Sequence, residues 1–224
     1  QVLQLNPVYP HGWNNLGYLH AKLGKFEASK NAFMKAVELD SLNPELNRNL
    51  GIVLMKLGEV DLAISSYKQG LRGARCLSFD RSTTRHFASL GTIRFRAAIQ
   101  TEANDYNVSF SEWGTIRFPP RPESPPVIRN PENRIKVHYD SEQLELLLEC
   151  DFDAQAIKYI IEYEVRGYNG LVELDPVQPV FADIWKKLGA AYESKGNSQK
   201  SVESFNQARF TTRMSRNRDS RKAR

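Results

Sequence analysis

The sequence predicts a mainly α-helical chain, built from antiparallel helix pairs and interrupted by an irregular insert with short β-strands. Three observations favour this fold class. A residue pattern repeats at a spacing of 34 near the N-terminus, the same pattern returns near the C-terminus, and the stretch between the copies loses the helical period.

The N-terminal pattern marks one face of a helix and the point where that helix ends. Trp13, Leu16, Gly17 and His20 are spaced i, i+3, i+4 and i+7, which places them on one helical stripe. Gly17 would let a second helix approach closely, and Gly24 falls where the first helix must turn. Residues 1–75 are therefore expected to hold the end of one pair and two complete pairs. The repeated positions are Pro10, Leu16, Gly17, Lys22, Leu23 and Gly24, which recur as Pro44, Leu50, Gly51, Lys56, Leu57 and Gly58.

A third copy predicts another pair over residues 178–211. Trp185, Leu188 and Gly189 match Trp13, Leu16 and Gly17 at a displacement of 172 residues, which is not a multiple of 34. Something other than whole repeats must therefore lie between the copies.

The period of 34 and the W-x2-L-G signature resemble the tetratricopeptide repeat, a pair of antiparallel helices. This resemblance implies a helical solenoid in which the first helices line a concave groove. The stretch LQLNPVYP resembles the tail of a second helix, so the chain is expected to open inside a repeat, with more repeat sequence upstream.

The stretch from 76 to 140 is expected to be an irregular, proline-rich insert containing β-strands. The pentapeptide GTIRF occurs at 91–95 and again at 114–118, with alternating polar and apolar residues that indicate two short strands, paired as a hairpin. The prolines around PPRPESPP exclude helix and favour an extended linker or strap. Helix is expected to resume as a degenerate hairpin over 141–177, where Leu144 to Leu148 and Ala156 to Ile161 supply two apolar stripes.

The signatures of common catalytic and cofactor sites are missing. The sequence has no Walker A, G-x-G-x-x-G, G-x-S-x-G or H-E-x-x-H pattern, and its four histidines are scattered. Glu149, Asp151 and Asp153 could hold a divalent cation, although such a run more often caps a helix break. We therefore expect no enzyme activity, no cofactor and no metal site.

A peptide-binding surface is expected opposite the packing stripe. At 100° per residue, Asn15 and Lys22 point away from Trp13, and a carboxamide can both donate to and accept from a peptide backbone. The N-L-G triplets beginning at Asn15 and Asn49 resemble the ladder in the repeat superhelix of O-GlcNAc transferase. Because Arg48 lies beside Asn49, capture of a partner's C-terminal carboxylate stays an open alternative. The predicted groove residues are Asn15, Lys22, Arg48, Asn49, Lys56 and Lys187.

A basic tail over residues 212–224 offers a second kind of contact. It could neutralise RNA phosphates, or it could be a solvated extension of the last helix. The candidate residues are Arg213, Arg216, Arg218, Arg221 and Lys222.

These features together predict a non-enzymatic scaffold or adaptor that binds an extended, acidic protein segment within a larger complex. Two alternatives stay open: a structural subunit of a large ribonucleoprotein assembly, and a regulatory module of a larger enzyme. No apolar run is long enough for a membrane helix. With only two widely spaced cysteines, Cys76 and Cys150, the cytoplasm or another reducing compartment such as an organelle matrix is expected.

Overall fold

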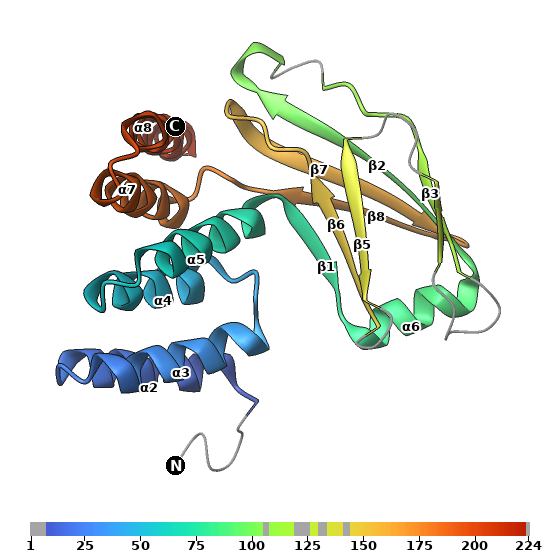
Figure 1. The fold of residues 1–224 in the computed structure, drawn as a ribbon. Helices are drawn as coiled ribbons and strands as arrows, with labels where there is room; N and C mark the ends of the chain where they lie inside the picture. The colour runs from blue at the N-terminus through green and yellow to red at the C-terminus, as the bar shows by residue number, and fades with distance from the viewer. Residues whose placement is uncertain (1–7, 105–107, 119–125, 130–133, 141–143, 223–224) are drawn as a thin grey trace. The chain divides into compact units, whose positions relative to one another are not determined.

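The computed structural model describes residues 8–104, 108–118, 126–129, 134–140 and 144–222, which form two compact units (Figure 1). The helical unit joins the segment up to Ala74 with the segment from Val177 onward. The insert unit spans Arg75–Pro176. Each unit has a hydrophobic core of its own.

Over residues 8–74 and 177–222, the helical unit consists of three antiparallel helix pairs. Each pair is tightly packed, and the pairs follow one another with α3 against α4 and α5 against α7. The helices are α2 (Pro10–Lys22), α3 (Phe26–Leu39), α4 (Pro44–Lys56), α5 (Val60–Arg72), α7 (Pro179–Ser194) and α8 (Ser198–Lys222), with the short 3-10 turn η1 (Gly73–Arg75) after α5.

The expected close approach of the two helices is present in all three pairs. An aromatic ring from the second helix lies against a glycine of the first, so closely that an added methyl group would come within 3.0 Å of the ring. In the first pair, Ser29 Oγ also donates a 2.7 Å hydrogen bond to the carbonyl oxygen of Gly17. The three contacts are Gly17 with Phe33, Gly51 with Tyr67 and Gly189 with Phe205.

Left-handed glycines end the first helices as the sequence predicts. Gly24 and Gly58 follow α2 and α4 with φ of +70° and +78°. An L residue with a side chain rarely adopts this conformation, whereas glycine adopts it readily, so the chain can reverse into the second helix.

The third pair packs directly against the second, although about a hundred residues separate them in the sequence. Ile184 of α7 lies against Gly70 of α5, and both helices contribute to one apolar core. The displacement of 172 residues is therefore close to the sum of two repeat periods and the inserted unit.

In its described residues, the insert unit contains two antiparallel sheets and the helix α6. Strand order is β1-β6-β5 in the smaller sheet and β4-β3-β2-β7-β8 in the larger, and residues from both sheets share one core. The elements are β1 (Cys76–Phe79), α6 (Arg81–Leu90), β2 (Thr92–Thr101), η2 (Glu102–Asn104), β3 (Gly114–Arg117), β4 (Val127–Arg129), β5 (Ile135–Asp140), β6 (Glu145–Cys150), β7 (Ala156–Val165) and β8 (Tyr168–Leu174).

The repeated pentapeptide pairs with itself, which confirms the expected antiparallel strands. Ile93 lies opposite Ile116, and Thr92 lies opposite Arg117. The first strand is longer than expected, because β2 continues to Thr101 and also pairs with β7. Much of the proline-rich strap, 119–125 and 130–133, lies outside the described residues, as does the opening stretch 1–7.

Two expectations for the insert are wrong. The supposed helical hairpin at 141–177 consists of β6, β7 and β8, and helix α6 occurs where no helical period was expected. In β6 the three fully buried residues, Leu146, Leu148 and Cys150, are spaced by two and therefore lie on one face of the strand. Helix α6 is short and mostly polar, but Asp80 caps it by accepting a 2.7 Å hydrogen bond from the Thr83 amide.

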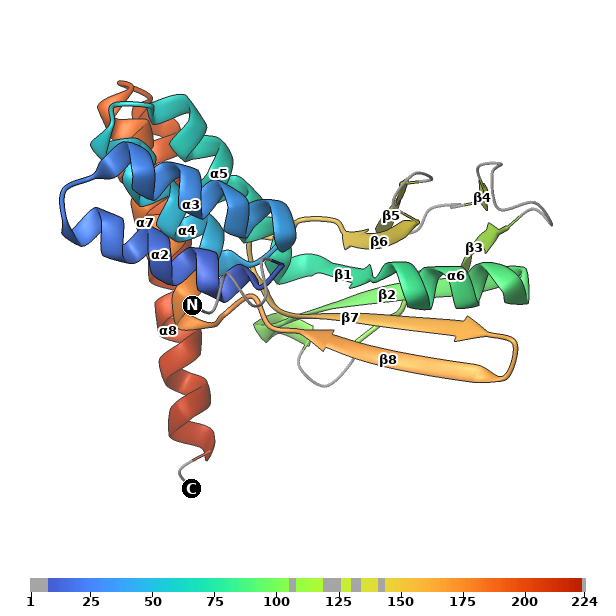
Figure 2. The same cartoon turned by 90° about the horizontal axis from the view of Figure 1, so that it is seen from below.

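The coarse prediction of a mainly helical chain with some antiparallel strands is confirmed. Residues 212–222 of the supposed tail belong to α8, which runs on past the end of α7 (Figure 2). Among the residues with a described position, no helix combines the length and apolar character that crossing a membrane requires.

Candidate functional site

A continuous polar network joins the first helices of the three pairs. Asn49 Nδ2 of α4 donates to Asn14 Oδ1 of α2 at 2.9 Å. Arg48 donates to Asn49 Oδ1 through Nε at 3.4 Å and Nη2 at 3.3 Å. Its Nε also lies 3.8 Å from Asp183 Oδ2 of α7, and Lys187 Nζ lies 3.4 Å from Asp183 Oδ1. We call these five residues the first-helix network.

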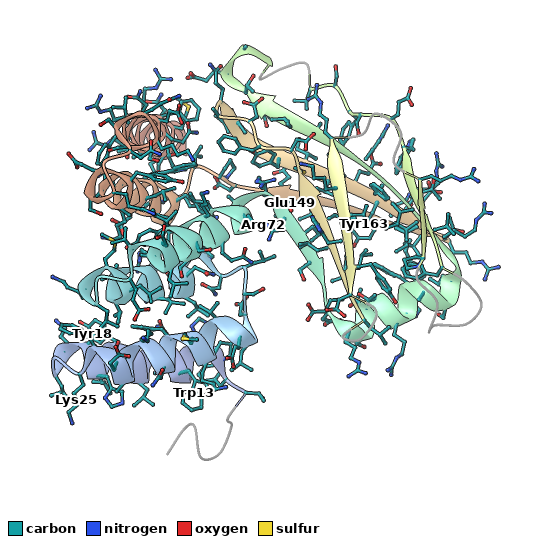
Figure 3. All side chains as sticks on the ribbon, in the orientation of Figure 1. Trp13, Tyr18, Lys25, Arg72, Glu149 and Tyr163 are labelled. Carbon is teal, nitrogen blue, oxygen red and sulfur yellow. The ribbon has the colours of Figure 1, made fainter. Side chains whose placement is uncertain are left out.

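Three of the six predicted groove residues belong to this network, namely Arg48, Asn49 and Lys187. The other three, Asn15, Lys22 and Lys56, are exposed on α2 and α4 and lie outside it. Lys22 Nζ instead lies 5.2 Å from the ring centre of Tyr18, one turn earlier on the exposed side of α2 (Figure 3).

Asn14 and Asp183 are not among the predicted groove residues. Asn14 directly precedes the predicted Asn15, and Asp183 lies two residues before the late Trp185 signature. An i, i+4 spacing of Asp183 and Lys187 is a recognisable ion-pair signal on a helix. The bond between Asn14 and Asn49 has no such local signal, because it depends on how two pairs pack.

The helical unit is strongly basic. It holds 19 Lys and Arg against 10 Asp and Glu, whereas the insert unit holds 12 against 16. In α5, burial raises the pKa of the Tyr67 hydroxyl, and the negative charge of Asp183 in the network raises it further. Tyr67 therefore stays neutral at physiological pH.

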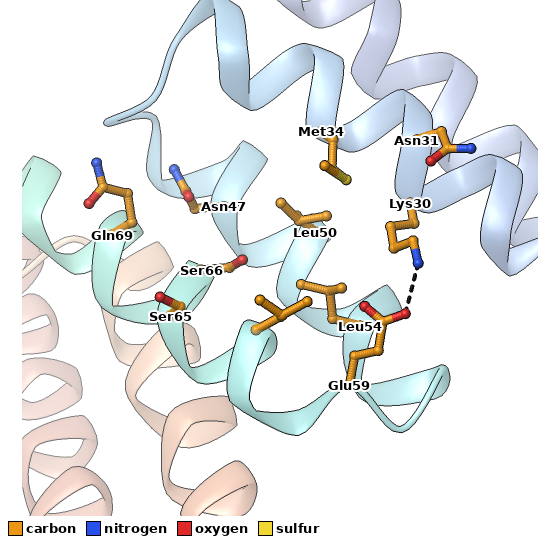
Figure 4. A pocket seen from close by; sticks show the side chains of 11 residues that line it. Lys30, Asn31, Met34, Asn47, Leu50, Leu54, Glu59, Ser65, Ser66 and Gln69 are labelled. Carbon is orange, nitrogen blue, oxygen red and sulfur yellow. Dashed lines mark hydrogen bonds and ion pairs between the residues drawn. The ribbon is translucent and has the colours of Figure 1, made fainter.

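Apart from this network, a hollow lies between α3 and α5, and α4 forms part of its wall. It encloses about 540 Å³ and is lined by apolar side chains that include Met34, Leu50 and Leu54 (Figure 4). One end is bounded by an ion pair of 2.7 Å between Lys30 Nζ and Glu59 Oε1. The hydrogen bonds to Glu59 and Glu27 raise the pKa of Lys30.

Another hollow, of about 460 Å³, lies over the first pair and is lined by Trp13, Leu16 and His20 among others. Trp13 faces away from α4 (Figure 3). His20 Nδ1 is buried there without a hydrogen-bond partner.

Two carboxylates of the acidic run in the insert form ion pairs with basic side chains. Glu149 pairs with Arg75 and with His138 Nε2 at 2.9 Å, and Asp151 pairs with Lys136. Within the described ranges, no three His, Cys, Asp or Glu side chains are grouped so that they could hold a metal ion.

The two cysteines are free and buried in the insert. Burial is the main cause that raises the pKa of the Cys150 thiol to about 12. A thiol with so high a pKa is protonated at physiological pH and is therefore a poor nucleophile.

The C-terminal arginines are arranged along α8. Arg213 and Arg216 are exposed, and Arg213 lies over the ring of Phe210 at 5.8 Å. The side chains of Arg218, Arg221 and Lys222 lie outside the described residues. RNA contact at this end stays a prediction, as does a role inside a ribonucleoprotein or as a module of a larger enzyme.

Comparisons with known proteins agree with the helix pairs. A family model described as "Tetratricopeptide repeat" matches residues 10–41 and 182–208, which lie in the first and third pairs. A TPR repeat-containing protein of Methanocaldococcus jannaschii is 33% identical over 67 residues, 30% of this chain. The match spans only 12% of that relative's length.

Among solved structures, the crystal structure of MamA aligns over 96% of this chain and 85% of its own, with 13% identity and a TM-score of 0.30. The family match, the named relative and the three glycine-to-aromatic contacts all concern the helix pairs. The chain therefore carries helix pairs that match the tetratricopeptide repeat at residues 10–41 and 182–208.

Proposed function

We propose that the helical unit is a non-enzymatic adaptor whose three repeats form one short solenoid and bind an extended protein segment along α2, α4 and α7. The repeats suggest a role in protein–protein interaction, since helical repeats generally stack into extended concave binding surfaces. The first-helix network carries the proposal, because it places hydrogen-bonding side chains from three successive first helices on one surface.

An extended segment fits this surface better than a helix does. Its backbone presents carbonyl and amide groups regularly along its length, and carboxamide side chains can bind them without reading its sequence. The apolar hollow between α3 and α5 is the competing location and would instead suit apolar side chains.

The proposal is tested by replacing the two carboxamides. The double variant Asn14→Ala with Asn49→Ala removes one hydrogen bond between α2 and α4 from a partly exposed place, so we expect the fold to survive. Partners captured by the wild-type protein should be identified, and binding of their extended segments should be measured by titration. We expect the double variant to weaken binding at least about tenfold, or 1.4 kcal/mol.

A matched variant separates the two surfaces. Met34→Asp with Leu62→Asp places two charges in the hollow between α3 and α5, where both side chains are exposed. If this variant loses the partner while the asparagine variant keeps it, the partner binds the second helices and the proposal is wrong.

A further inference from the structure

The first-helix network has a one-sided chemistry that follows from the donor and acceptor roles of its members. Arg48 can only donate, so Asn49 must turn Oδ1 toward the guanidinium. Asn49 Nδ2 then faces α2, and Asn14 must accept with its own Oδ1. The orientation of both carboxamides is therefore fixed by Arg48.

These internal bonds engage both carboxamide oxygens and leave N–H groups available. In the described structure, Asn14 keeps both hydrogens of Nδ2, Asn49 keeps one, and Arg48 keeps part of its guanidinium. The surface thus offers mainly donors. A partner must supply acceptors, and carboxylates are the strongest acceptors in proteins.

The carboxylate of Asp183 is shared by two cationic side chains in this network. Asp183 lies 3.8 Å from Arg48 Nε and 3.4 Å from Lys187 Nζ. Both distances exceed the roughly 2.7–2.9 Å of a charge-assisted hydrogen bond. All three side chains are partly exposed, at 27%, 41% and 32% for Arg48, Asp183 and Lys187, so an incoming group can reach them.

We propose that Asp183 is an internal stand-in for a ligand carboxylate, and that an acidic extended segment displaces it from Arg48 and Lys187. This inference rests on the proposed function and adds to it a residue, Asp183, that competes with the acidic segment expected from the sequence. The excess of basic residues in the helical unit would draw such a segment to the surface. Because Asp183 already pairs with both cations, an uncharged segment would gain little binding free energy from contacting them.

The test measures binding of two synthetic probes to the full chain by fluorescence anisotropy. One probe is a labelled, C-terminally amidated peptide of repeated Glu-Ser-Gly units, and the other has Gln at each Glu. Asp183→Asn removes the competing charge, so we expect it to tighten binding of the Glu peptide about three- to tenfold. Arg48→Gln should weaken that binding by a similar factor. Neither substitution should change binding of the Gln peptide.

Two control variants account for net charge alone. Glu203→Gln removes a negative charge from α8, and Lys68→Gln removes a positive charge from α5; both residues are exposed and lie outside the network. We expect each control to change the affinity for the Glu peptide by less than about twofold at physiological salt, because exposed charges farther away than about 8 Å are screened. Thermal melting of each variant checks that it is folded.

Three results would overturn the inference. The first is an Asp183→Asn protein that binds the Glu peptide no better than wild type. The second is a control variant that changes affinity as much as its network counterpart, which would indicate general charge attraction. The third is the absence of binding of both peptides to every variant. The proposed function is judged separately by partner binding to the Asn14 and Asn49 double variant, so either can fail while the other stands.

Discussion

Single residues in equivalent repeat positions show how each pair is held together. Trp13 and Trp185 occupy one such position, and the second repeat has Asn47 there. Asn47 is only 1% exposed, and its Nδ2 donates to the carbonyl oxygens of Ser41 and Asn43 at 2.8 and 2.9 Å. In the second repeat, the aromatic packing residue is therefore replaced by an asparagine that hydrogen-bonds to the loop before α4.

The glycine-to-aromatic contact permits a direct test at this scale. We expect Gly51→Ala to lower the free energy of unfolding of the helical unit by about 1–3 kcal/mol, because the new methyl group would lie 2.3 Å from the Tyr67 ring. Chemical denaturation followed by circular dichroism at 222 nm measures the change. Alanine is the better helix former by about 1 kcal/mol, so a stabilised variant would show that the ring moves aside freely.

At the scale of elements, the helices that carry a repeat signature could be predicted from the sequence and the central strands could not. The stripe of Trp13, Leu16 and Gly17 has a helical period because only one side of α2 packs against its neighbours. Strand β7 lies between β2 and β8, and Ile160 on its outer face is half buried. Apolar residues on both faces hide the period of two, which is why residues 156–161 resembled a helical stripe.

Two adjacent isoleucines distinguish the strand from the expected helix. Ile161 is fully buried in the insert core, whereas Ile160 points to the opposite face of the sheet. We expect Ile161→Ala to cost about 2–5 kcal/mol of stability in the insert unit, and Ile160→Ala to cost clearly less. Urea denaturation followed by tryptophan fluorescence reports this unit through Trp113 when Trp13 and Trp185 of the helical unit are replaced by Phe in every protein compared. Equal losses for the two variants would contradict the strand.

The candidate site was predictable only in part for a related reason. Asn49 and Lys187 could be placed opposite the packing stripe from helical geometry within their own helices, whereas Arg48 was predicted as a carboxylate ligand beside Asn49. Their partners Asn14 and Asp183 could be assigned only once α2, α4 and α7 lay side by side. Because α7 follows α4 by more than a hundred residues, no local spacing indicates that contact.

The whole molecule combines a basic helical unit with an acidic insert placed between two repeats. An insertion is tolerated where the chain leaves one packed element and returns to the next, because such points carry few buried backbone hydrogen bonds. Here the helical unit ends at Ala74 and resumes at Val177, and α5 and α7 share one core. The repeat interface therefore does not depend on an uninterrupted sequence.

That independence predicts the result of removing the insert. We expect a chain in which a flexible Gly-Ser linker of about ten residues replaces residues 75–176 to keep all three helix pairs and to unfold in one cooperative transition. Circular dichroism should show a higher mean helicity than in the full chain, because the strands are gone. Ile184→Asp in the shortened chain is the control, since it places a charge in the core between α5 and α7 and should free the third pair. If the shortened chain instead shows two transitions, or if Ile184→Asp leaves its unfolding unchanged, the third pair depends on the insert unit for its place beside α5.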